Sequence, residues 1–248
     1  MSRIELEAGG RINGADLSQL DWADRDLSDI TLTDCTIRDA QLSGVSLQGA
    51  RLTGCRLVRC RFAHADLREA RFEACSFADE EDHKGLEIAF SQLDQAAFRG
   101  CDLSFAKLDR TSAYGIACED CNWRGASFAK VDFHRAFGRS IVRCEGAFRG
   151  CNLELADLSE ISLPGGDFSG SSLREAVLAQ ADLAGANLSR CDFFLADTYG
   201  AKLAGADLRG AQVDGLDLSE LGSWRGAKIA LDQQHALLSA MGLDIYAE

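Results

Sequence analysis

Apolar residues recur every five positions through most of this chain, and this period constrains the fold more than any other feature. The clearest stretch is 201–218, which reads AKLAG-ADLRG-AQVDG-LDL, with large apolar third residues at Leu203, Leu208, Val213 and Leu218. One face of an α-helix returns every three or four residues, so a five-residue period is not helical. Two residues that are two apart point the same way on an extended backbone. The unit is therefore a short strand step with two inward side chains, followed by a corner.

The same register extends far in both directions. Large apolar residues occupy the unit centres from Leu17 to Phe77, and a second series, one residue later in phase, runs from Leu93 to Leu218. Repetition at a fixed short period is the signature of a solenoid, in which each coil contacts only its neighbours. We therefore predict one elongated all-β solenoid. The second series lapses at Ala113, Cys118, Gly138, Arg143 and Thr198.

The periodic pattern divides the chain into three segments. Residues 1–14 are predicted as a lead-in strand or cap, and residues 15–218 as the repeat. Two stretches that interrupt the repeat, 78–85 and 129–140, are predicted to project as loops, although a distorted but continuous coil is an alternative for the second. After residue 218 the apolar residues take helical spacing. The segment 219–248 is therefore predicted to hold a helix that caps the last coil or contacts a second copy of the chain.

Eight of the ten cysteines are predicted to be core residues. They lie two places before a unit centre, where alanine is usual and where a free cysteine acts as a small buried hydrophobe. The Cys118-x-x-Cys121 pair lacks a second pair or spaced histidines, so no zinc site is expected. Reduced thiols, an N-terminus without an apolar signal segment and the lack of a membrane-spanning apolar run favour a cytoplasmic protein. The eight are Cys35, Cys55, Cys60, Cys75, Cys101, Cys121, Cys151 and Cys191.

No motif in the chain indicates catalysis or cofactor binding. The four histidines are scattered, and none lies in an HExxH motif. There is no glycine-rich phosphate loop and no nucleophile elbow, and no pair of carboxylates is marked out for separate acid and base roles. We therefore expect a binding or structural protein without cofactors rather than an enzyme.

Negative charge accumulates toward the C-terminal end. The net charge is −13, and residues 148–248 hold 7 basic and 15 acidic residues, a balance of −8. Residues 51–75 are the exception, because six arginines and three acidic residues give +3. Nucleic-acid binding needs a basic stripe, so direct binding to nucleic acid is not expected. The six arginines are Arg51, Arg56, Arg59, Arg61, Arg68 and Arg71.

The units resemble a known repeat. The segments ADLSQ, ADLRE, CDLSF, ADLAG, ANLSR and ADLRG match the A(D/N)Lxx pattern of pentapeptide-repeat proteins, over about residues 15–218. The resemblance implies a right-handed quadrilateral β-helix with four units in each coil. Within that family the chain is similar to the quinolone-resistance (Qnr) proteins. This similarity rests on the charged loop ending at Lys84-Gly85, the following AAFRGCDLSFAKLDRTSAYGI and RGASF segments, and the C-terminal HALLSAMGLDI.

The resemblance also implies a function and a set of contact residues. In Qnr proteins two loops contact the topoisomerase and two subunits join at their C-termini, so this chain is expected to bind DNA gyrase, topoisomerase IV or both, and to protect them from quinolone-type inhibitors. The first loop would contribute Asp79, Glu80, Glu81, Asp82, His83 and Lys84, and the second Phe133, His134, Arg135, Phe137 and Arg139. The homodimer would join through Leu231, Leu237, Leu238, Met241, Leu243 and Ile245.

A physical argument supports this implied function. B-DNA is a rod with about one negative charge per 1.7 Å, and a stiff acidic β-helix presents carboxylates at regular intervals on a similar rod. Two copies joined at their C-terminal ends would bring two −8 segments together, which a basic DNA-binding saddle would attract. For any single aspartate, the alternative is a local hydrogen bond that stabilises the corner. The predicted acidic face comprises Asp157, Asp167, Asp182, Asp192, Asp197, Asp207 and Asp217.

Two other functions remain open at this point. The chain could be a structural or scaffold solenoid with an unrelated protein partner, in which case the acidity serves solubility. It could also provide self-immunity to a DNA-targeting natural product made by the same cell, which would use the same mechanism as topoisomerase protection.

Overall fold

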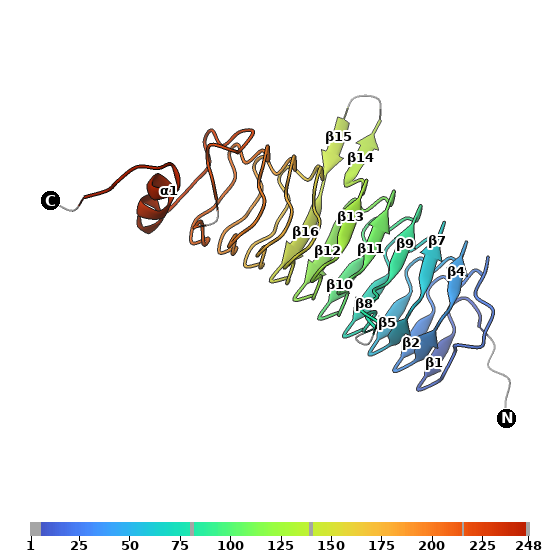
Figure 1. Cartoon of the computed structure of the whole chain (residues 1–248). Helices are drawn as coiled ribbons and strands as arrows, with labels where there is room; N and C mark the ends of the chain where they lie inside the picture. The colour runs from blue at the N-terminus through green and yellow to red at the C-terminus, as the bar shows by residue number, and fades with distance from the viewer. Residues whose placement is uncertain (1–5, 80–81, 139–140, 215, 247–248) are drawn as a thin grey trace.

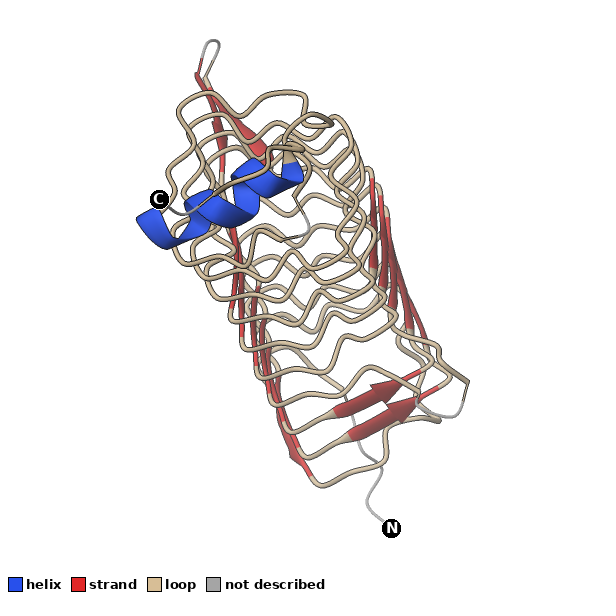
Figure 2. Ribbon diagram, turned by 60° about the vertical axis from the view of Figure 1, so that its left-hand side comes forward, coloured by secondary structure: helices blue, strands red, loops and turns tan. Residues whose placement is uncertain are grey.

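The computed structural model describes residues 6–79, 82–138, 141–214 and 216–246. It is a right-handed quadrilateral β-helix whose coils stack into a rod (Figure 1), with a short helix across the C-terminal end (Figure 2). Parallel register partners are separated by four units of five, as in Thr31↔Arg51 and Arg51↔Arg71. Each coil therefore has four faces, as the resemblance implied.

We number the four faces in the order in which the chain visits them. Face 1 carries the seven-stranded sheet β1 (Arg11–Asn13), β2 (Thr31–Thr33), β5 (Arg51–Thr53), β8 (Arg71–Glu73), β10 (Ala97–Arg99), β12 (Ile116–Glu119) and β16 (Gly146–Arg149). Face 2 carries β3 (Thr36–Arg38) and β6 (Arg56–Val58). Face 3 carries β4 (Gln41–Ser43), β7 (Arg61–Ala63), β9 (Glu87–Ala89), β11 (Lys107–Asp109) and β13 (Ser127–Ala129). Face 4 is joined by single bridges, such as Ser46↔Asp66.

Beyond Arg149 the faces continue as single parallel bridges between coils. Face 1 continues through Ala147↔Asp167, Asp167↔Asn187, Asn187↔Asp207 and Asp207↔Lys228. In the first three of these bridges the partners are separated by the same four units. The partners in the last bridge are one residue further apart, so one residue is inserted in the final coil.

Two inward side chains from each unit fill the core, as the five-residue period predicts. The centre Leu188 and the small residue two places earlier, Ala186, are both fully buried. Aromatic centres stack from coil to coil, and the rings of Phe72 and Phe98 are nearly parallel with centroids 4.7 Å apart. The eight cysteines predicted in the core are buried and free. Burial raises the pKa of the Cys60 thiol to about 11, so this thiol stays protonated at neutral pH.

Most corners hold a residue with positive φ, two places after the unit centre. Glycine takes this conformation readily, as at Gly205 with a φ of 72°. Aspartate is enriched there relative to most residues, and Asp24 has a φ of 53°. Leu155 and Leu195 occupy two corners with φ of 58° and 57°, where a leucine is strained by about 1–2 kcal/mol. The core does not require leucine at either place, because both side chains point outward.

The first interruption lengthens one coil by six residues. The bridge partners Asp66↔Gln92 are separated by six residues more than the usual four units. At the base of the projecting segment, Asp79 and Lys84 form an antiparallel bridge in which the Asp79 N–H donates to the Lys84 carbonyl at 2.7 Å. The chain then returns to face 3 on β9.

The second interruption is an antiparallel hairpin of β14 (His134–Phe137) and β15 (Ile141–Cys144), which projects from the rod (Figure 1). The bridge partners Asn122↔Asn152 are separated by six units of five instead of four, so the insertion adds two units. An insertion of two whole units preserves the five-residue phase. For this reason Gly138 and Arg143 coincide with predicted centres although neither lies in a coil. The other lapsed centres, Ala113, Cys118 and Thr198, are buried in the core.

The ladder begins inside the segment predicted as a lead-in. Ile12, on β1, lies one unit before Leu17 in the same phase and pairs with Leu32. At the other end the bridges extend past residue 218 to Lys228.

A terminal helix covers the last coil. The short 3-10 turn Leu231–Gln233 precedes α1 (Gln234–Ala240). The Gln233 side-chain amide donates to the carbonyl oxygens of Leu208 and Ala211, at 2.7 Å each, and Leu237 packs into the core. The helix therefore caps the chain's own solenoid.

Candidate protein-binding surface

The seven aspartates predicted to form one acidic face lie on four different faces. Asp167 and Asp207 are on face 1, and Asp192 and Asp182 are on faces 2 and 4. Face 3 carries Asp157 and Asp197. Asp217 follows Asp197 by 20 residues, the usual length of one coil, and we assign it to face 3 on that separation. The prediction of a single acidic face is therefore wrong, because consecutive units of five occupy consecutive faces.

Each of these seven carboxylates makes the local hydrogen bond that was the alternative interpretation. In every case Oδ1 accepts the backbone N–H of the residue two places later, at 2.8–3.2 Å. At Asp217 the hydrogen bonds from the side chain and backbone of Ser219 lower the pKa of the carboxyl. The corner role is thus common to all seven, and their surroundings distinguish them.

On faces 1, 2 and 4 basic side chains neutralise these aspartates. The Arg209 guanidinium, 2.6 Å from the Asp207 carboxylate, lowers the pKa of that carboxyl to about 2. The other ion pairs are Arg149–Asp167 at 2.6 Å, Arg174–Asp192 at 2.9 Å and Lys202–Asp182 at 3.4 Å.

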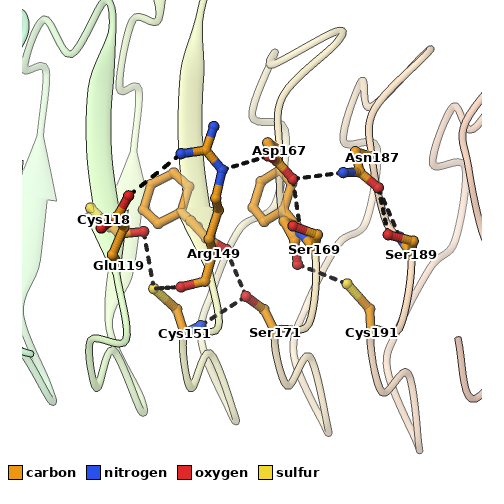
Figure 3. A network of polar contacts seen from close by, with 12 residues as sticks. Cys118, Glu119, Arg149, Cys151, Asp167, Ser169, Ser171, Asn187, Ser189 and Cys191 are labelled. Carbon is orange, nitrogen blue, oxygen red and sulfur yellow. Dashed lines mark hydrogen bonds and ion pairs between the residues drawn. The ribbon is translucent and has the colours of Figure 1, made fainter. Parts of the chain in front are cut away.

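On face 1 the ion pairs join into a ladder along the rod (Figure 3). Arg149 lies between Glu119, at 3.7 Å, and Asp167. The amide of Asn187 extends the ladder by donating to Asp167 at 3.0 Å. Burial opposes ionisation of Asp167, but the hydrogen bonds from Arg149 and Ser169 lower the pKa of its carboxyl overall. This part of face 1 is therefore neutralised internally.

Face 3 carries carboxylates that are not neutralised. Asp157, Asp197 and Asp217 form no ion pair with any described residue, nor do Glu160 and Glu220 at its corners. Between residues 157 and 220 the outward and corner positions of face 3 hold no lysine or arginine. Of the seven predicted aspartates, the three in the C-terminal section of face 3 are therefore the ones without an ion pair among the described residues.

Apolar side chains stand beside these carboxylates. Leu155 and Leu195 lie at one corner of face 3, 42% and 63% exposed, and Tyr199 lies at the opposite corner, 60% exposed. Phe194 lies under the Arg174 guanidinium, 4.4 Å from its ring centroid. Exposed apolar groups within a charged surface are typical of protein interfaces. The sequence interpretation missed these exposed residues. Leucine at a corner position, where glycine is common, could have indicated them.

The first loop has a buried base and an exposed tip. Asp79 is only 7% exposed, and its carboxylate binds the guanidinium of Arg59, which also pairs with Asp39. The prediction that Asp79 contacts a partner is therefore wrong, because its side chain is used inside the chain. Asp82, His83 and Lys84 are exposed, whereas Glu80 and Glu81 lie outside the described residues.

In the second loop, Phe133 was predicted as a contact residue and is instead a core centre. It is 1% exposed and its ring lies edge-on to Phe148, with centroids 6.3 Å apart. The prediction was wrong because the hairpin begins at the next residue. That residue, His134, holds its Nδ1 3.1 Å from Asp132 on face 4. Arg139 lies outside the described residues.

An aromatic and guanidinium cluster anchors the hairpin to the rod. Phe137, 43% exposed, meets Tyr114 edge-on at 5.8 Å, and the Arg135 guanidinium lies 5.8 Å from both rings. Arg143 lies 5.5 Å from the Phe137 ring on the opposite strand. Tyr114 is buried, and burial followed by its hydrogen bond to Glu145 raises the pKa of its hydroxyl. The sequence interpretation did not find Tyr114, because the contact joins residues that are more than four units apart in the chain.

The C-terminal end presents the remaining predicted interface. Leu237 is 5% exposed and belongs to the chain's own core, so its assignment to a dimer contact is wrong. Trp224, Ile229 and Tyr246, which the sequence interpretation missed, are exposed. The one-residue insertion before them displaced Trp224 and Ile229 from the expected phase. The other predicted interface residues are exposed: Leu231, Leu238, Met241, Leu243 and Ile245.

The arginine cluster at 51–71 encircles the rod. Arg51 and Arg71 are neighbours on face 1, Arg56 lies on face 2 and Arg61 on face 3. Arg59, Arg61 and Arg68 are ion-paired, Arg61 with Glu87 at 3.9 Å and Arg68 with Asp66 at 2.5 Å. The cluster therefore does not form a single basic stripe.

Among the described residues, no group of three or more His, Cys, Asp or Glu side chains could hold a metal ion. In the same part of the chain, no helix is long and apolar enough to cross a lipid bilayer.

Comparison with known proteins identifies the repeat. A family model described as pentapeptide repeats matches segments 11–49, 46–79, 151–190, 171–210 and 186–220, which cover more than half of the chain. Among solved structures, a trypsin-treated variant of QnrB1, a plasmid-mediated fluoroquinolone resistance protein, is 23% identical with a TM-score of 0.76, covering 97% of this chain and 100% of that one. Full-length QnrB1 is 25% identical with a TM-score of 0.67, over 84% and 100%. No curated protein sequence matches this chain with significance.

Proposed function

We propose that this chain, which belongs to the pentapeptide-repeat family, binds DNA gyrase, topoisomerase IV or both and protects them from quinolone-type inhibitors. The observation that carries the proposal is the C-terminal section of face 3, where Asp157, Asp197 and Asp217 remain without ion pairs among the described residues. The similarity of the whole fold to QnrB1, a fluoroquinolone resistance protein, supports the choice of partner. The chain acts by binding and not by catalysis.

Face 3 replaces a stretch of duplex DNA on the enzyme. Adjacent coils are about 4.8 Å apart, so Asp197 and Asp217 lie one step apart along the rod, and Asp157 two steps before Asp197. A basic surface shaped for DNA attracts such a row of carboxylates, and complementary charge speeds the encounter. The aspartates on the other faces contribute little to this field, because their own arginines and lysines neutralise them.

The two projections contact the enzyme beside the DNA-binding surface. The exposed tip of the first loop and the exposed face of the hairpin extend from the half of the rod that precedes the acidic section. The packing of Phe137 against Tyr114 holds the hairpin in one direction. A fixed hairpin loses little conformational freedom on binding, which favours affinity. The bound protein then weakens the drug-stabilised cleaved complex.

The active form is a homodimer joined at the C-terminal ends. Exposed Trp224, Leu231, Met241 and Ile245 form apolar surface that a second copy covers, and a two-fold contact between identical surfaces is the commonest form of oligomer. This arrangement brings two segments of −8 charge together at the centre of the dimer. The protein works in the cytoplasm, where its buried free thiols stay reduced.

A supercoiling assay tests the proposal. DNA gyrase is incubated with relaxed plasmid and ciprofloxacin over a range of protein concentrations up to the micromolar range, and matched reactions without drug report any direct inhibition. We expect supercoiling to recover as the protein is added, with weaker recovery at higher salt because the attraction is electrostatic. Matched decatenation reactions test topoisomerase IV in the same way. The proposal would be contradicted by the absence of both protection and inhibition with both enzymes.

A further inference from the structure

A hollow of about 250 Å³ opens at the start of the acidic section of face 3. It lies between the coil that holds Phe128 and the coil stacked on it. The outward residues that flank the space, Ala129 and Ser159, are both small and leave it unfilled. Phe128, Val131 and Ile161 contribute apolar groups to its lining, and all three are largely buried in the core.

Two carboxylates stand at the rim of this hollow. Oδ1 of Asp157 accepts both the N–H and the hydroxyl of Ser159, at 3.0 and 2.6 Å, whereas its Oδ2 has no hydrogen bond or ion pair with any described residue. Glu160 is exposed and likewise has no ion pair within the described part of the chain. Lys130 also lines the rim, but it is not within ion-pair distance of either carboxylate.

We propose that this hollow is a binding site for an arginine side chain of the partner protein. A long cationic side chain has an apolar stem and a charged head, and the lining of the hollow combines apolar groups with two carboxylates. The planar guanidinium presents several donors at fixed angles, so one group can bind Oδ2 of Asp157 and the carboxylate of Glu160 together. The identity of the partner as a topoisomerase rests on the proposed function, but the site itself does not.

The site can be tested on the isolated protein with a small probe. N-acetyl-arginine methylamide is titrated into the isotope-labelled full-length protein, and backbone amide shifts are followed by NMR. We expect saturable shifts at Ser159, Glu160 and their neighbours, and their loss in the variant Asp157→Asn/Glu160→Gln. The norleucine analogue, which has the apolar stem without the charge, should leave these amides unchanged. Absence of saturable shifts at these amides with the arginine probe would overturn the proposal.

The second test measures affinity for the gyrase A subunit. We expect Asp157→Asn/Glu160→Gln to weaken binding about tenfold, since a partly desolvated charge loses its partner. The control Asp167→Asn/Asp207→Asn removes the same charge from face 1 and should change affinity by less than about twofold. Equal affinity of both variants and the wild type would overturn the site while leaving the proposed function intact. If the wild type does not bind the enzyme at all, the proposed function fails and the probe titration alone decides the site.

Discussion

The coils up to Arg149 and the coils from Cys151 onward share one core but differ on the outside. In the first region faces 1 and 3, and the start of face 2, pair as short strands, and both projections leave the rod there. In the second, single bridges join the coils at an unbroken spacing of four units, with no insertion up to residue 212. The unneutralised carboxylates of face 3 lie in this second region. The inward positions therefore determine the coil, while the outward and corner positions are free to differ. Under the proposed function, the projecting shape and the unneutralised charge would come from different halves.

Truncating the aromatic core where the two regions meet should have the largest effect on stability. The Phe148 ring contacts those of Trp123, Phe128, Phe133 and Phe168, with centroids 5.4–6.3 Å apart. We expect Phe148→Ala to lower the free energy of unfolding in urea by about 3–5 kcal/mol. The exposed Phe194→Ala serves as the control and should cost less than about 1 kcal/mol. A loss of less than about 1 kcal/mol for Phe148→Ala would show that the two regions do not share one packed core.

Deleting the hairpin tests whether the insertion is independent of the coil. Removal of 134–143 takes out two whole units and restores the four-unit spacing between Phe128 and its partner coil. We expect the free energy of unfolding to change by less than about 1 kcal/mol, while protection against quinolone is lost.

A deletion of the same length inside the regular coils is the matched control. Removal of 171–180 also keeps the five-residue phase, but it moves every later unit by two faces. Outward pairs between coils across the cut, such as Asn187 with Asp167, are then lost, and the ion pair of Arg174 with Asp192 is removed with Arg174 itself, so the protein should be destabilised. Full protection by the hairpin-deleted protein, with its fold retained, would contradict the proposed contact.

Acid should weaken both regions over the same pH range. The pKa values of Asp16 and Asp26 in the first region, and of Asp207 and Asp217 in the second, are lowered by hydrogen bonds or ion pairs at the corners. A carboxyl with a lower pKa in the folded state contributes its full stability above its ordinary pKa of about 3.9 and loses it as the pH falls further. We therefore expect hydrogen-exchange protection in both regions to decline together from about pH 4 toward pH 2. Loss confined to one region would contradict a corner role shared by all coils.

Thiol reactivity should show the smallest difference between the regions. All ten cysteines are free, and Cys144 at the hairpin base is the only one that is not buried. Burial raises the pKa of its thiol to about 11, so it should react slowly with a disulfide reagent at pH 8, and the other nine should react only after unfolding. Cys144→Ser should abolish the native-state reaction. Rapid reaction of several thiols would indicate that the coils open locally.

The sequence predicts the coil well, because the residues that form it are local and repeat every five positions. Centres and small inward residues, including the cysteines, are buried where the period places them. The face that each aspartate occupies requires the length of the coil, which the period alone does not supply. Which aspartates are neutralised also depends on contacts between residues far apart in sequence, because Arg149 and Asp167 are 18 residues apart. The two-unit hairpin left the phase unchanged, so its start, and with it the burial of Phe133, could not be read from the register.

Binding through face 3, as opposed to binding through net charge, is tested most directly by two triple variants that lose the same charge. One is Asp157→Asn/Asp197→Asn/Asp217→Asn on face 3, and the other is Asp167→Asn/Asp182→Asn/Asp207→Asn on the neutralised faces; asparagine keeps the Oδ1 acceptor at every corner. The measurement is the concentration of each protein that displaces linear duplex DNA from the gyrase A subunit. The face 3 variant should require at least about tenfold more protein than the wild type, and its counterpart less than about twofold more. Equal losses in the two variants would contradict recognition through face 3.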